Sequence, residues 1–73
     1  MAKPVFNDAV IACLDAVHSR LSEAAQIAKA AQACAHAGSL SEAVTVSMDI
    51  EQLIYEAGRL HDAASLLNRL AQD

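Results

Sequence analysis

The histidines and cysteines are the residues of this sequence whose side chains could bind a metal or act in catalysis. His18 and His61 occupy equivalent positions on the two helices predicted below, so we expect them on one layer of the fold. Two imidazoles supply half of a tetrahedral zinc site. No cysteine or carboxylate stands at ligand spacing on the same side, because Asp15 and Asp62 point more outward. The pattern therefore favours two half-exposed histidines over a metal-binding protein, and no cofactor is predicted.

Cys13 and Cys34 are 21 residues apart within one predicted helix. At 1.5 Å per residue this is roughly 30 Å, which is far beyond the reach of a disulfide. A nucleophilic thiol needs a neighbouring base and an oxyanion site, and the sequence indicates neither. Both residues are expected to be small packing residues, and their thiols suggest a reducing compartment. No catalytic residue is predicted, and the chain is not expected to be an enzyme.

The 73 residues allow one small domain, residues 1–73, with nine Asp/Glu, five Lys/Arg and a net charge of −4. A nucleic-acid binder needs clustered cations to neutralise phosphates. The basic residues are scattered along the chain instead: Lys3, Arg20, Lys29, Arg59 and Arg69.

No apolar run approaches the ~20 residues of a membrane span, and the first ten residues do not resemble a signal peptide. These features predict a soluble cytoplasmic protein.

The stretch AGSLSE, residues 37–42, is the clear break in a sequence rich in alanine and poor in glycine and proline. Gly38 suits the left-handed position that ends a helix. Ser39 and Glu42 have the spacing of a capping box, which begins the next helix. Pro4 and Asn7 are both suited to the start of the first helix. The fold class predicted is therefore all-α: a helix at about 5–37, a turn at 38–39 and a second helix at about 40–72, packed as an antiparallel hairpin.

Both predicted helices carry an apolar seam with alternating steps of three and four residues, which is a heptad repeat. In the first helix the seam is Val10, Leu14, Val17, Leu21, Ala24, Ala28, Ala31 and Ala35. In the second it is Ala43, Val46, Ile50, Leu53, Ala57, Leu60, Ala64, Leu67 and Ala71. In an antiparallel register, a large residue of one seam opposes a small one of the other in four of six facing layers, as a well-filled core requires. The same register brings Arg20 beside Glu56 and predicts an ion pair.

Two helices cannot enclose a core, and flanking apolar residues make each stripe wider than one helix–helix contact needs. The pattern predicts that two hairpins associate as a symmetric four-helix bundle, so a homodimer is expected. Its core would contain Leu14, Val17, Leu21, Ile50, Leu53, Leu60 and Leu67. This layout resembles the Rop family of plasmid-encoded helical hairpins, which dimerise and bind RNA. The resemblance lies in the architecture and in the alternation of small and large core layers.

A second, interrupted stripe of apolar residues lies on the second helix away from the seam: Val44, Met48, Tyr55 and Leu66. Such a stripe is a hint of a partner helix or groove. The function predicted is therefore that of a non-enzymatic, oligomerising protein-interaction or regulatory module, with another protein as a second partner. The alternatives are a Rop-like nucleic-acid-associated regulator, against which the scattered cations argue, and, third, a metal-binding protein.

Overall fold

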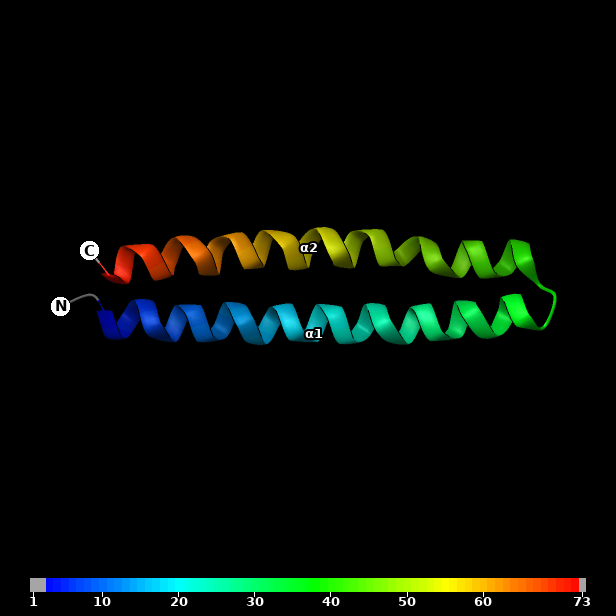
Figure 1. The fold of residues 1–73 in the computed structure, drawn as a ribbon, viewed down its shortest axis with the longest axis horizontal. Coiled ribbons are helices and arrows are strands. Elements are labelled where there is room, and N and C mark those ends of the chain that lie inside the picture. Colours follow the sequence, from blue (N-terminus) through cyan, green and yellow to red (C-terminus); the bar gives the residue numbers. More distant parts are fainter. Residues whose placement is uncertain (1–2, 73) are drawn as a thin grey trace.

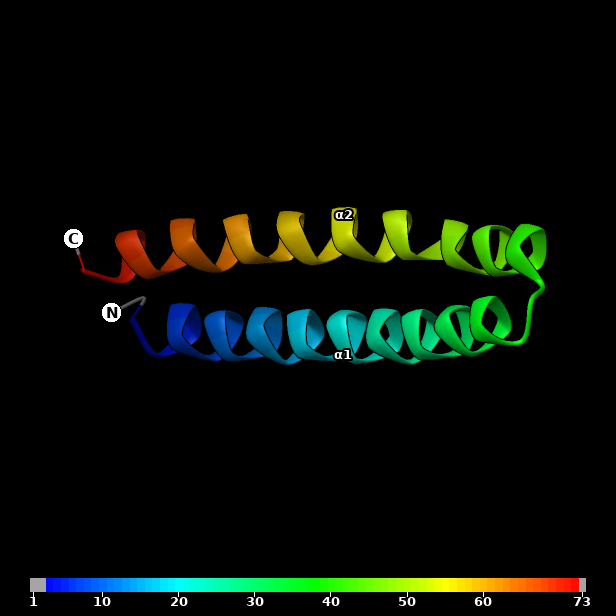
Figure 2. The ribbon, with the colours of Figure 1, turned by 45° about the vertical axis from the view of Figure 1, so that its right-hand side comes forward.

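The computed structural model describes residues 3–72 and contains two long helices joined by a tight turn. Helix α1 spans Lys3–His36 and helix α2 spans Leu40–Gln72. They run antiparallel and side by side along their whole length, so the start of α1 and the end of α2 lie at one end of the hairpin (Figures 1 and 2). The Cα atoms span 57 × 13 × 11 Å. The predicted fold class, an all-α helical hairpin, is confirmed. Helix α1 begins two residues before the predicted start, so Asn7 lies inside it rather than at its cap.

The turn reverses the chain through one glycine. Gly38 has φ = 92°, and its N–H donates to the carbonyl of Ala35 at 3.0 Å. The N–H of Ser39 donates to the carbonyl of Cys34, also at 3.0 Å. These two bonds form a Schellman motif, which satisfies carbonyls left free at the end of α1. The Ser39 carbonyl accepts the first bond of α2, from Ala43 at 2.9 Å. Among the side-chain hydrogen bonds of residues 3–72, none is accepted by the Ser39 hydroxyl or by the Glu42 carboxylate, and the Ser39 N–H donates to Cys34 instead, so the reciprocal capping box is not formed.

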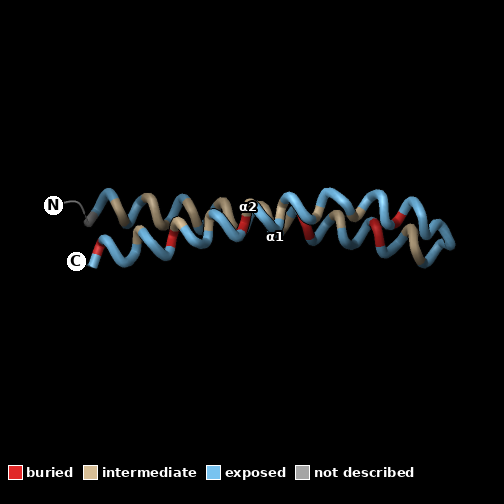
Figure 3. Tube along the Cα trace, turned by 90° about the horizontal axis from the view of Figure 1, so that it is seen from above, coloured by how far each residue is buried: buried red, intermediate tan, exposed pale blue. Residues whose placement is uncertain are grey.

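The centre of the hairpin is built almost entirely of alanine. The buried side chains of the described residues are Ala24, Ala31, Ala43, Ala57, Ala64 and Ala71. Four of these belong to α2 and recur at heptad spacing, with Ile50 half-buried in the remaining place. Small side chains let the two backbones approach closely, and the half-buried residues follow the line of contact (Figure 3). The seam predicted for α2 is therefore confirmed, except that Val46 remains 37% exposed.

The seam predicted for α1 is only half correct. Val10 and Val17 are half-buried as expected, but Leu14 and Leu21 are 48% and 44% exposed, and Ala28 is exposed as well. Each of the residues that precede Leu14, Leu21, Ala28 and Ala35 in the chain is half-buried and lies nearer to α2. These residues are Cys13, Arg20, Ile27 and Cys34.

The physical reason is that α1 carries apolar residues on both sides of the row Val10, Val17, Ala24 and Ala31. One neighbouring helix can cover only one of those sides. Counting heptads favours the side with the larger leucines, whereas the hairpin turns the other side toward α2. The leucine side is left at the surface.

Candidate functional site

The predicted ion pair between the helices is present. The Arg20 Nε donates to the Glu56 Oε1 at 2.8 Å, and the Gln52 Nε2 donates to the Glu56 Oε2 at 3.0 Å. The hydrogen bond from Gln52, followed by the hydrogen bond from Arg20 and its positive charge, lowers the pKa of Glu56 below its usual value. Both partners of the pair are 39% exposed, so it contributes little energy and chiefly fixes the register of the helices.

His18 and His61 do not form part of a metal-binding cluster in the structure. The His18 Nε2 lies 3.4 Å from the Ser22 hydroxyl, one turn along the same helix. His61 lies beside a surface groove with apolar neighbours. Within residues 3–72 no group of three or more histidines, cysteines, aspartates or glutamates is close enough to share a metal ion. Cys13 and Cys34 are free thiols, both half-buried in α1.

The apolar residues left at the surface form a more promising feature. The described large hydrophobic residues that are exposed number twelve: Val5, Ile11, Leu14, Leu21, Leu40, Val44, Val46, Met48, Ile54, Tyr55, Leu66 and Leu70. They include two of the predicted core residues, Leu14 and Leu21. The other five predicted core residues, Val17, Ile50, Leu53, Leu60 and Leu67, are half-buried between the helices.

A shallow groove of about 290 Å³ runs between the helices at the middle of the hairpin. Its lining comes from both helices: Val17, Leu21, Ile54, Ala57, Gly58 and His61. Gly58 borders open space in this groove, because a Cβ placed there would meet nothing within 4 Å. The sequence did not predict this groove, although an off-seam glycine in the middle of a long helix was a signal that could have indicated it.

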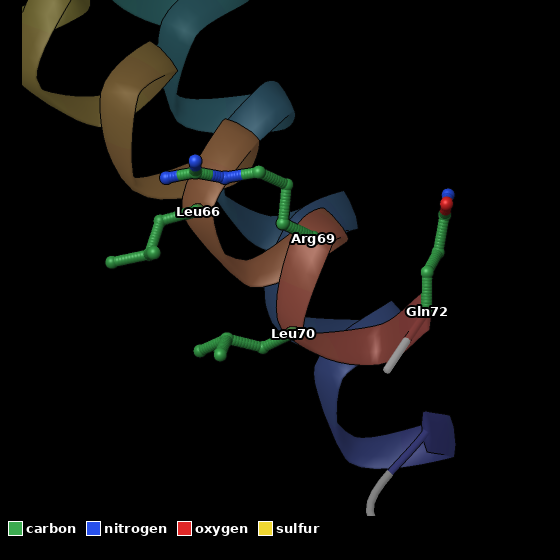
Figure 4. A pocket seen from close by; sticks show the side chains of 4 residues that line it. All are labelled: Leu66, Arg69, Leu70 and Gln72. Atoms are coloured by element: carbon green, nitrogen blue, oxygen red, sulfur yellow. The ribbon is translucent and has the colours of Figure 1, made fainter.

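The predicted partner-binding residues Val44, Met48, Tyr55 and Leu66 are all exposed, at 62%, 65%, 61% and 48%. The Arg59 guanidinium lies over the Tyr55 ring, 5.9 Å from its centroid, which holds the ring against the helix surface. Leu66 lies apart from the other three, beside a second open hollow of about 320 Å³ that also contacts Arg69, Leu70 and Gln72. Figure 4 shows Leu66 and Leu70 projecting from the last turns of α2 on the same side. The four residues therefore do not form one continuous patch.

Comparison with protein-family models, with curated proteins and with solved structures gives no match for this chain. None of the described helices is long and apolar enough to cross a lipid bilayer.

Proposed function

We propose that this chain is a non-enzymatic interaction module, a helical hairpin that associates with a second copy of itself and presents the outside of α2 to another protein. The observation that carries the proposal is the distribution of apolar side chains. Among the described residues, the six buried side chains are all alanines, while twelve larger hydrophobic residues are exposed. A chain this short gains little stability from its own core and commonly needs a second copy to complete it.

Self-association would cover part of this surface, and the outside of α2 would remain available. Tyr55 and Met48 lie there one heptad apart, and both are more than 60% exposed. Tyrosine offers a large contact area with few rotamers to fix, and methionine adapts to an irregular partner. The free thiols of Cys13 and Cys34 support a reducing compartment, so we place the protein in the cytoplasm.

The partner surface can be tested by affinity capture from cell extract followed by mass spectrometry. Replacing both Met48 and Tyr55 by Ala should weaken capture of a specific partner at least tenfold, about 1.4 kcal/mol, while helicity and oligomer mass stay unchanged. Val5→Ala is a matched control, because Val5 is 68% exposed but lies on α1. If capture survives the double substitution, the outside of α2 is ordinary surface. If the oligomer dissociates instead, these residues belong to the self-association interface.

A further inference from the structure

The two sides of the hairpin differ sharply in character. We call one side the apolar flank and define it by the groove and the residues that continue it at helical spacing: Ile11, Leu14, Val17, Leu21, Ala25 and Ala28 on α1, with Ile54, Ala57, Gly58 and His61 on α2. Residues seven apart lie on the same side of a helix in a coiled-coil pair, which places Leu14 and Ala28 in one row with Leu21.

The opposite side of the hairpin carries charged residues. Arg20 and Glu56 meet there, and heptad spacing places Asp49 in the same row as Glu56. Heptad spacing also extends the rows of the apolar flank along both helices. Of the described residues in those rows, two are Asp, Glu, Lys or Arg: Glu51, and Lys3 at the first position of α1. A surface almost free of formal charge, with apolar groups at its centre, is what association through burial requires.

The exposed area of the hairpin matches what a second copy would cover. The chain exposes 5338 Å², whereas a compact monomer of 7.7 kDa exposes about 4,300 Å². The excess is about 1,000 Å². A standard protein interface takes about 800 Å² from each partner, so docking one further hairpin on this flank removes an excess of this size.

The sizes of the side chains along α1 indicate how the second copy is oriented. Leu21 lies near the middle of the helix, with Leu14 toward the open end and Ala28 toward the turn. If two flanks meet with their turns at opposite ends, a two-fold axis near Leu21 brings Leu14 of each copy over Ala28 of the other. If both turns lay at the same end, Ala28 of one copy would meet only residues in the turn half of the other copy. Leu14 of the other copy would then not lie over it. The opposed orientation fills the interface without a void.

We propose that a second copy of this chain docks on the apolar flank, with its turn at the opposite end of the resulting four-helix bundle. This rests on the self-association proposed above and adds the face and the orientation. The interface is isologous, because each copy uses the same flank. The outside of α2, with Met48 and Tyr55, stays free.

The orientation can be measured by spin-label distances in the full chain. Ser39→Cys, in a background with Cys13→Ala and Cys34→Ala, places one nitroxide at each turn. The background variant first needs to retain the helicity and oligomer mass of the unsubstituted protein. Helix α1 has 34 residues, so turns at opposite ends are separated by about 50 Å, whereas turns at the same end lie within about 20 Å. A distance near 50 Å is expected, and one near 20 Å would overturn the orientation.

The face is tested by a matched pair of substitutions followed by sedimentation. Leu21 on the apolar flank is 44% exposed and Leu70 on the opposite side is 45% exposed, so Leu21→Asn and Leu70→Asn remove similar surface within one hairpin. Leu21→Asn should raise the dimer dissociation constant at least tenfold, and Leu70→Asn should change it less than threefold. A dimer that tolerates Leu21→Asn but not Leu70→Asn would place the interface on the other side. If Leu21→Asn unfolds the chain, the turn-to-turn distance still decides the orientation. A monomeric unsubstituted protein would contradict the proposed self-association itself.

Discussion

Ala64 tests whether close packing of alanines holds the two helices together. This residue is 5% exposed and lies on the inner side of α2, away from the groove. Replacing it by Leu exchanges a methyl for an isobutyl group at a place with no room for one. Overpacking of this kind costs about 1–3 kcal/mol, because the helices must separate or the side chain must leave its preferred rotamer. In a domain of this size 1 kcal/mol shifts the melting temperature by about 4–8 °C, so a cost of 2 kcal/mol corresponds to a decrease of roughly 12 °C.

The control is Ala12→Leu, which makes the same chemical change at an exposed position of α1. Leucine and alanine are both good helix formers, so this substitution should change stability by no more than about 0.5 kcal/mol. Thermal unfolding followed by circular dichroism at equal protein concentration provides the comparison. Equal melting temperatures for the two variants would refute the alanine-packed interface. A higher melting temperature for Ala64→Leu would mean that the helices lie further apart than in this structure.

Gly38→Ala forces a left-handed backbone on a residue with a Cβ, so it should lower stability by about 1–2 kcal/mol in chemical denaturation; no loss would mean that the turn does not have this conformation. Because the folded-state pKa of Glu56 is lowered, its contribution is present above the unfolded-state pKa and is lost as the pH falls through the lowered value. The melting temperatures of the original protein and Glu56→Gln should therefore differ at neutral pH and converge in acid, and a difference that persists in acid would contradict this reasoning. Melts with and without a chelator should coincide, and a large decrease with chelator would reveal a metal site.

Much of the fold could be predicted from the sequence because its signals are local. Gly38 marks the end of one helix, and the regular steps of α2 identify the side that faces its neighbour. The facing positions of Arg20 and Glu56 followed from the antiparallel register, and the 2.8 Å contact confirms them. All of this depends on spacing along one chain.

The inner side of α1 could not be predicted in the same way. Cys13 and Ile27 on one side of the row, and Leu14 and Leu21 on the other, are all apolar, so the heptad pattern is compatible with two rotations of the helix. Only the packing of α1 against α2 distinguishes the two, and it places Cys13 and Ile27 nearer to α2. The groove around Gly58 arises from both helices together, and for that reason no spacing within one helix predicts it.

Sedimentation equilibrium over a range of concentrations around tens of micromolar tests the central claim most directly. The chain has a mass of 7.7 kDa, and we expect a species of twice that mass that dissociates on dilution together with loss of helicity. A folded monomer of 7.7 kDa at every concentration would contradict the account, because the exposed apolar flank would then have no second copy to cover it.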